Sequence, residues 1–406
     1  MKYLLNKIQL DGDKIIWRII LLLVFLSIPV AYSTATKVAE MDGYRHSVHW
    51  YFINRHVIFL IAGLAILFIC HRIPVSVYKN FSTVLLAVSI GLLVYMSFFG
   101  VKINEATRWI AIGSIKFQPV EVAKISVVLY LASILEDNVF DNFKDVFKKI
   151  ILPIGTICVL TFVSGISMGL LLGIICMSIL FIGGLKVKHL FKVFGLALAG
   201  LTLLVILGLT IGWPPRVSMG LRNRIANPNK IENTNNQVNE NTQAYKAKVA
   251  VASGGLVGKG PGNSTQRYSL PHADSDFIYS IIIEEYGLFS GILLLIIYMV
   301  LLYRAAIIAK KCTRIFSSVT VLGLMLMVVF QAMLHMAVAT GVFAVTGQTL
   351  PFISRGGTSM LFTGIAFGII LSVSRAANLQ ETSKQQSDDE KYIPNDINEK
   401  TIEYNG

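Results

Sequence analysis

Residues 150–185 read IILPIGTICVLTFVSGISMGLLLGIICMSILFIGGL, an uninterrupted apolar run of 36 residues without a charged side chain. As a single helix this run would be about 54 Å long, because an α-helix rises 1.5 Å per residue. The hydrocarbon core of a bilayer is only about 30 Å thick. The run therefore predicts two membrane-spanning helices, 150–165 and 166–184, with a tight turn near Gly165.

Similar apolar stretches recur along the whole chain. The sequence of 406 residues is 54% hydrophobic and only 15% charged, whereas soluble domains carry about 25% charged residues. A stretch of about twenty apolar residues can cross a bilayer. We therefore expect an all-α polytopic membrane protein with about ten transmembrane helices. The other predicted spans are 15–35, 51–70, 81–99, 119–135, 190–212, 277–303, 315–341 and 358–375.

The positions of Lys and Arg predict the orientation. Loops that are cytoplasmic when the N-terminus is inside carry 15 Lys and Arg, and the short loops on the other side carry 7. Residues 1–14 are thus expected to be a cytoplasmic tail and 15–376 the transmembrane domain. Residues from about 213 to 276 form one long extracytoplasmic loop, first Asn-rich and then glycine-rich. The acidic residues 377–406 are expected to be a disordered cytoplasmic tail.

The formal net charge of +13 limits the kinds of partner. A basic membrane protein contacts anionic lipid headgroups or handles an anionic substrate. No stripe of alternating basic and aromatic residues is present, so we expect no nucleic-acid partner.

Glu121 and Lys124 lie at a depth where ionisable groups are functional candidates. Their spacing of three places both on one face of a helix, and Pro119 suits the first turn of that helix. They are either an ion pair that neutralises two costly charges or a lysine for a substrate phosphate, oriented by the glutamate. The residues alone do not favour one of these two interpretations.

Asp276 stands where the long loop meets the next predicted span, in the segment Ser275-Asp276-Phe277-Ile278. Aspartate is a favoured N-cap residue, and on the residues alone this interpretation is preferred. The alternative is a catalytic carboxylate at the boundary of water and membrane. Glu284 and Glu285 lie two turns further into the helix, where carboxylates must be paired or face a cavity.

The segment 351–359 precedes the last predicted span and contains Ser354, Arg355 and the double glycine at 356 and 357. A double glycine allows the backbone to approach a ligand closely. Arg355 can bind an anion through two hydrogen bonds. The alternative is a loop that re-enters the membrane only for packing.

Taken together, these segments resemble the SEDS family (shape, elongation, division and sporulation), the FtsW, RodA and SpoVE proteins, from about residue 15 to 376. The Gly262-Asn263-Ser264 sequence is similar to the division branch. The motifs that carry the resemblance are Arg108-Trp109 with Gln118-Pro119-x-Glu121-x-x-Lys124, Ser253-Gly254-Gly255-x-x-Gly258-x-Gly260, Leu270-Pro271 with Ser275-Asp276-Phe277-Ile278 and Glu284-Glu285, and Pro351-Phe352-x-Ser354-x-Gly356-Gly357-x-Ser359.

The resemblance implies a peptidoglycan glycosyltransferase. Family members polymerise lipid II, a disaccharide pentapeptide on undecaprenyl pyrophosphate, into β-1,4-linked glycan strands. They act with a class B penicillin-binding protein, the transpeptidase, and with other division proteins at the septum. The implied location is the bacterial cytoplasmic membrane, with the active site on the extracytoplasmic side. The expected cofactor is a divalent cation, Mg²⁺ or Mn²⁺, with unknown ligands and no organic cofactor.

The resemblance also assigns roles to residues. Asp276 matches the family's essential aspartate and is the predicted catalytic base. The chain departs from the family pattern at Val120, Ser167 and His272. The predicted substrate-binding residues are Arg108, Glu121, Lys124, Lys259, Ser354, Arg355, Gly356 and Gly357, with supporting roles for His272, Glu284 and Glu285.

Three alternative functions remain open at this point. One is a lipid II flippase, but a transporter should carry its key charges near the midplane and consist of two related halves. Here the candidates cluster at the outer boundary and no internal repeat is visible. A second is an elongation polymerase similar to RodA. A third is an inactive scaffold for division proteins, against which the intact Asp276 motif argues.

Overall fold

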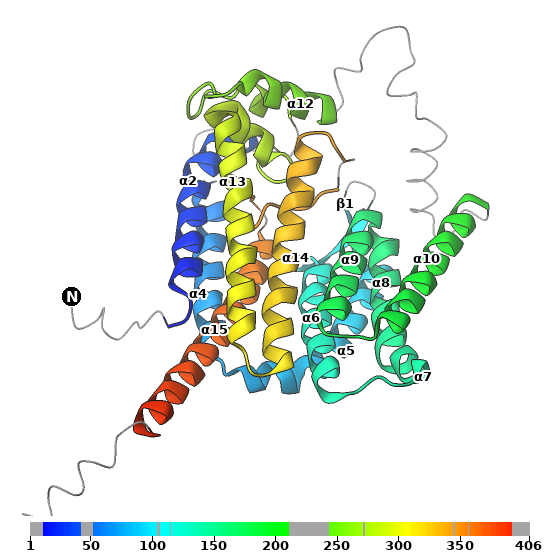
Figure 1. Cartoon of the computed structure of the whole chain (residues 1–406). Coiled ribbons are helices and arrows are strands. Elements are labelled where there is room, and N and C mark those ends of the chain that lie inside the picture. Colours follow the sequence, from blue (N-terminus) through cyan, green and yellow to red (C-terminus); the bar gives the residue numbers. More distant parts are fainter. Residues whose placement is uncertain are drawn as a thin grey trace, which may run out of the picture.

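The computed structural model describes residues 11–391 except 42–51, 104–105, 114, 211–242, 271–272, 344–345 and 356. Each of the ten predicted spans is helical in the described residues, which confirms the helical membrane fold (Figure 1). The helices are α2 (Lys14–Met41), η1 (Ile53–Val57) with α4 (Ile58–Arg72), α5 (Val75–Phe99), α6 (Pro119–Asp137), α7 (Phe143–Val146) with η2 (Phe147–Ile151) and α8 (Leu152–Ser164), α9 (Ile166–Ile182), α10 (Val187–Thr210), α13 (Ile278–Lys311), α14 (Ile315–Ala339) and α15 (Thr358–Lys391).

Seven of the helices in the described residues are long and apolar enough to cross a membrane. The α4 and α9 helices are apolar but shorter. The α6 helix contains Glu121 and Lys124 near its start and two acidic residues at its end, yet most of its side chains are buried. Charge inside a well-packed helix points to a role for those residues in the bundle interior.

The break at Gly165 has the predicted position. The α8 helix ends at Ser164 and α9 begins at Ile166, while Gly165 is extended with φ −173° and ψ 113°. The two helices pack tightly beyond the turn, because a Cβ on Gly169 would lie 2.6 Å from the Phe162 Cα atom. The prediction of two helices with a turn in this run is therefore confirmed.

A small antiparallel sheet lies in the segment that the sequence analysis treated as a plain loop. Strands β1 (Val101–Ile103), β2 (Ala106–Ile112) and β3 (Ile115–Phe117) pair in the order β1-β2-β3. Strands β1 and β3 have only three residues each, and the seven residues of β2, ATRWIAI, do not alternate strictly between apolar and polar. The sheet connects α5 to α6 and carries Arg108 on its central strand.

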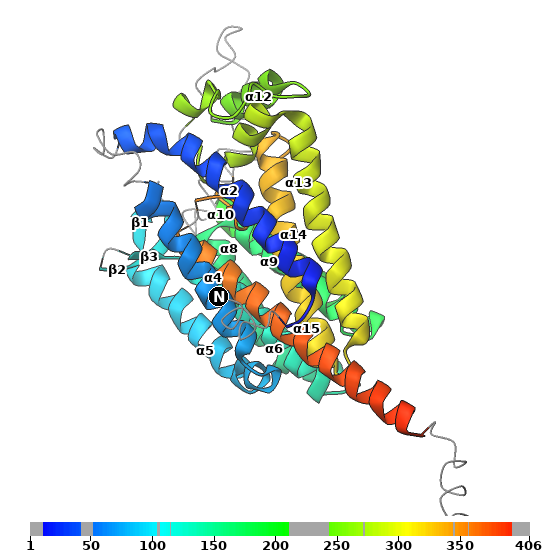
Figure 2. The same ribbon diagram turned by 90° about the vertical axis from the view of Figure 1, so that its left-hand side faces the viewer.

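One further helix, α12 (Gln243–Gly254), occupies the glycine-rich side of the predicted long loop. It lies across the start of α13 at one end of the bundle (Figures 1 and 2). Its Ala247 and Ala250 are buried in a small apolar cluster with Phe277 and Ile281. The Asn-rich part of the predicted loop lies outside the described residues.

The last helix is longer than predicted. The α15 helix packs along α4 and continues past residue 376 to Lys391. Residues 377–391, for which disorder is predicted, are thus helical in the structure, and their Gln, Glu and Lys residues favour a helix. The remaining tail, 392–406, lies outside the described residues.

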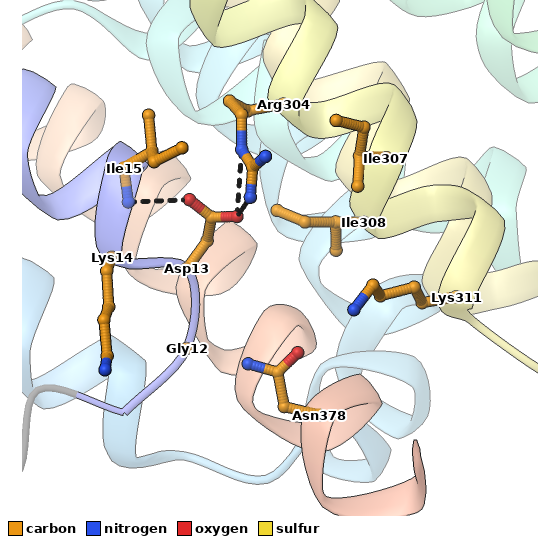
Figure 3. A pocket seen from close by; sticks show the side chains of 9 residues that line it. All are labelled: Gly12, Asp13, Lys14, Ile15, Arg304, Ile307, Ile308, Lys311 and Asn378. Atoms are coloured by element: carbon orange, nitrogen blue, oxygen red, sulfur yellow. Dashed lines mark hydrogen bonds and ion pairs between the residues drawn. The ribbon is translucent and has the colours of Figure 1, made fainter.

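A pocket of about 280 Å³ lies at the end of the bundle opposite α12, between α2, α13 and α15 (Figure 3). Asp13 caps α2 by accepting hydrogen bonds from the amides of Ile15 and Ile16, and its other oxygen accepts from Arg304. Lys311 pairs with Glu381 at 2.6 Å. The ion pairs of Arg304 with Asp13 and of Lys311 with Glu381 therefore connect α13 to α2 and α15 at this pocket.

Candidate active site

Asp276 lies in the turn that leads into α13. The N-cap position of α13 is occupied by Phe277, with φ −124° and ψ 18°. No side chain at that position caps the helix by a hydrogen bond. The N-cap interpretation of Asp276 is therefore wrong. The Asp276 side chain is only half-buried, so a carboxylate at the end of the bundle is accessible.

Asp276 and Arg108 both lie close to Gly347. Gly347 has φ +68°, and a Cβ at this position would lie 3.4 Å from the Arg108 Nη1 atom and 3.7 Å from the Asp276 Oδ2 atom. Burial lowers the pKa of the Arg108 guanidinium, and the nearby Asp276 carboxylate raises it. The guanidinium and the carboxylate thus approach the same point beside Gly347, whose positive φ favours glycine.

The break between α8 and α9 holds Arg108 in place. The Nε–H group of Arg108 donates to the Ser164 carbonyl oxygen at 3.2 Å. A Cβ on Gly165 would lie 3.5 Å from the same nitrogen. The turn that divides the long apolar run therefore also contacts the Arg108 side chain and holds it in position.

Glu121 and Lys124 form a buried ion pair. The Lys124 Nζ atom lies 2.9 Å from Glu121 Oε1, and their side chains are 3% and 9% exposed respectively. Lys124 also donates to Gln331 Oε1 at 2.6 Å, and Gln331 Nε2 donates to the Thr349 carbonyl oxygen at 2.9 Å. The pair thus connects α6 and α14 to the segment that contains Gly347. The ion-pair interpretation is supported, and a contact with substrate stays a prediction.

The segment 350–355 meets the turn that contains Asp276. The Ser354 hydroxyl donates to the Ser275 carbonyl oxygen at 2.8 Å. Arg355 Nε lies 2.7 Å from Asp274 Oδ2, and the Arg355 amide donates to the Asp274 carbonyl oxygen at 2.8 Å. Two segments that the sequence analysis treated separately are thus joined in space. Asp274 was missed, although an acidic residue in the same short motif as Asp276 was a usable signal.

Glu284 and Glu285 are both buried and both paired. Glu284 accepts hydrogen bonds from Lys259 Nζ at 2.6 Å and from the Thr265 amide at 3.1 Å. Glu285 contacts the Ser33 hydroxyl and lies 3.9 Å from Arg267 Nη1. Glu284 therefore connects α13 to the glycine-rich segment and the residues that follow it, and Glu285 connects α13 to α2 and to Arg267. Lys259 has a structural partner here, and its contact with substrate stays a prediction.

Glycine allows the glycine-rich segment to approach α13 this closely. A Cβ on Gly254 would lie 2.1 Å from the Ile283 carbonyl oxygen. A Cβ on Gly258 would lie 2.4 Å from the Glu285 carbonyl oxygen, and one on Gly287 would lie 2.2 Å from the Leu256 carbonyl oxygen. Three backbone contacts without side chains thus place this segment against the start of α13.

We expect Gly254→Ala to destabilise the protein by about 1–3 kcal/mol, because the new methyl group overlaps backbone that cannot move easily. The measurement is the unfolding temperature of the purified protein in detergent. The matched control is Gly195→Ala on α10, where a Cβ meets nothing within 4 Å. An unchanged unfolding temperature for Gly254→Ala would show that the contact is not tight.

Two predicted site residues, His272 and Gly356, lie outside the described residues. Gly357 follows directly and has φ +50°, a backbone conformation that glycine adopts readily. Arg108, Asp276, Ser354 and Arg355 lie in segments that the structure brings to one end of the bundle.

Comparisons with known proteins agree with this architecture. The family model described as "Cell cycle protein", that of FtsW, RodA and SpoVE, matches residues 13–379. The chain is 30% identical over 351 residues to the probable peptidoglycan glycosyltransferase FtsW of Coxiella burnetii, covering 84% of this chain and 91% of that protein. It is 28% identical to stage V sporulation protein E of Bacillus subtilis, covering 89% and 97%.

Solved structures share the fold. RodA of Thermus thermophilus is 24% identical and superposes with a TM-score of 0.64, covering 90% of this chain and 97% of that one. A chain from a peptidoglycan synthase complex superposes with a TM-score of 0.68 at 24% identity, covering 90% and 98%. The match of the family model over most of the sequence, together with these relatives, shows that the chain belongs to the FtsW/RodA/SpoVE family, the SEDS family.

Proposed function

We propose that this chain is a peptidoglycan glycosyltransferase that polymerises lipid II into glycan strands. The relative from Coxiella burnetii is named as a probable enzyme of this kind. The observation that carries the proposal is that the Asp276 carboxylate and the Arg108 guanidinium both lie within 4 Å of the Cβ position of Gly347. A base beside a fixed cation is what glycosyl transfer from a pyrophosphate donor requires.

The proposed reaction forms one bond and breaks one. A sugar hydroxyl of the acceptor attacks C1 of the donor sugar, and the Asp276 carboxylate accepts the hydroxyl proton. The bond from C1 to the phosphate oxygen breaks, and undecaprenyl pyrophosphate leaves with the bonding electrons. Attack on the face opposite the leaving group inverts an α-linked donor to a β-1,4 link.

Arg108 supplies positive charge for the departing pyrophosphate. An arginine guanidinium is always charged in proteins and binds phosphate oxygens through two parallel hydrogen bonds. Its position is fixed by the Ser164 carbonyl oxygen. A fixed charge stabilises the transition state without reorganisation during the reaction.

A divalent cation, Mg²⁺ or Mn²⁺, is the cofactor that we propose, and no organic cofactor. Within the described residues no three side chains of His, Cys, Asp or Glu gather. These residues do not fit an all-protein metal site, so no step of the reaction is assigned to a protein-bound metal. A cation of this type is often held chiefly by substrate phosphates.

We assign the enzyme to septal synthesis during cell division, with elongation as the alternative. Supporting the assignment, the relatives from Coxiella burnetii and Nitrosomonas europaea are both named FtsW. The proposed partner is a class B penicillin-binding protein, together with other division proteins. The proposed location is the bacterial cytoplasmic membrane, with the α12 end of the bundle on the extracytoplasmic side. Lipid II on the outer leaflet then reaches Asp276 directly.

The flippase alternative lacks comparable support. A transporter needs charged groups along a path through the bundle. In the described residues Glu121 and Lys124 neutralise each other in a buried pair, while Asp276 and Arg108 lie in a turn and a strand beyond the helices. This distribution favours chemistry at one surface.

The test is polymerisation of lipid II by the purified full-length chain with its cognate transpeptidase, in the presence and absence of Mg²⁺ or Mn²⁺. We expect glycan strands from the complex. Transport of lipid II across vesicles without strand formation under any of these conditions would instead establish the flippase. Failure of both assays would leave the scaffold function.

A further inference from the structure

Asp274 and Arg355 are joined twice, although 80 residues separate them in the sequence. The Arg355 Nε atom lies 2.7 Å from Asp274 Oδ2, and the Arg355 amide donates to the Asp274 carbonyl oxygen at 2.8 Å. One contact is between side chains and the other between main chains. Together they fix both the direction of the guanidinium and the path of the backbone two residues before Asp276.

Neighbouring contacts hold the same two segments. The Ser354 hydroxyl accepts a hydrogen bond from the Leu350 amide and donates to the Ser275 carbonyl oxygen, both at 2.8 Å. The Tyr298 hydroxyl of α13 donates to the Pro351 carbonyl oxygen at 2.7 Å. The segment 350–355 is therefore fastened both to the turn around Asp276 and to the helix that follows this turn.

Because Asp274 is buried, its ion pair with Arg355 is the most important of these contacts between the two segments. Asp274 is 2% exposed, and a buried carboxylate is retained only with a partner of opposite charge. The Arg355 side chain is 25% exposed, and its Nε atom lies against the Asp274 carboxylate. If Arg355 turned towards a substrate phosphate, this ion pair would break beside a buried carboxylate.

We propose that Asp274 and Arg355 are positioning residues, whose ion pair holds the turn of Asp276 in the geometry that the acceptor hydroxyl requires. This inference rests on the proposed glycosyltransferase function and replaces the expectation that Arg355 binds the substrate directly. Proton transfer stays with Asp276. The pair contributes by keeping that carboxylate within reach of the reacting oxygen.

The test compares kcat and KM for lipid II among the wild type, Asp274→Asn, Arg355→Gln and the double variant. A misplacement of about 1 Å lowers the rate by about 10²-fold, so we expect a large loss of kcat in each single variant with little change in KM. The double variant should be no slower than the slower single variant, because one substitution already breaks the ion pair between Asp274 and Arg355.

Direct binding of substrate by Arg355 gives a different pattern. KM would rise in Arg355→Gln and not in Asp274→Asn, and the losses would add in the double variant. That pattern would overturn the inference. Failure of the wild type to make strands would count against the proposed function itself, whereas a normal kcat in Asp274→Asn would count against the positioning pair alone.

Two further variants complete the experiment. Ser354→Ala removes the hydrogen bond from the Ser354 hydroxyl to the Ser275 carbonyl oxygen and leaves no charge unpaired. We expect kcat to fall roughly fivefold with unchanged KM, which corresponds to the loss of one hydrogen bond. If the Asp274 variants do not fold, an unchanged kcat in Ser354→Ala overturns the inference. The control is Asp141→Asn, whose exposed pair with Lys186 lies far from α12 along the chain and should not affect kcat.

Discussion

Asp276→Asn is expected to reduce lipid II polymerisation by about 10³-fold while the protein still folds. The amide has the size and shape of the carboxylate but cannot accept the proton of the attacking hydroxyl. It also removes the negative charge that acts on Arg108, a second side chain close to Gly347. The binding of lipid II should change less than the rate, because the lost interaction is made during bond formation.

The measurement is the rate of strand formation by the purified variant with its cognate transpeptidase. Unfolding temperature and elution volume in detergent must match those of the wild type, since the Asp276 side chain is half-buried. Asp141→Asn is the matched control, with the same chemical change in an exposed ion pair. A wild-type rate in Asp276→Asn would show that another group accepts the proton.

The sequence was sufficient for the helices because their lengths follow from physical limits. The run 150–185 is too long to cross a bilayer once, and the break at Gly165 follows from that excess. The three-stranded sheet and the helix α12 were not predicted. The strands of the sheet have only three to seven residues, and α12 lies in a polar segment where no bilayer length applies.

The candidate site could be predicted only as separate motifs. The family resemblance singled out Asp276, and the double-glycine segment singled out Arg355, but neither indicated that Arg355 would pair with Asp274 across 80 residues. Gly347 was missed because its importance lies in the close approach of Arg108 and Asp276. Contacts between distant segments depend on how the helices pack, and a single sequence does not contain that information.

Lys124→Met is expected to lower the free energy of unfolding by about 3–5 kcal/mol, because it leaves the buried Glu121 carboxylate without its partner. Lys124 is 2.9 Å from Glu121 and 2.6 Å from Gln331. Removing it breaks both contacts and frees Gln331, which holds the segment of Gly347 through Thr349. We therefore expect a lower unfolding temperature in detergent and weaker polymerisation.

The double variant Glu121→Gln with Lys124→Met separates these two effects. It carries no charge at either position, so most of the lost stability should return. Polymerisation should stay low, because Gln331 still lacks the lysine that orients it towards the segment of Gly347. Lys186→Met, which opens an exposed pair, is the control and should change stability little. If the double variant is as unstable as the single one, the unpaired charge is not the cause; if it regains full activity, the pair serves stability alone.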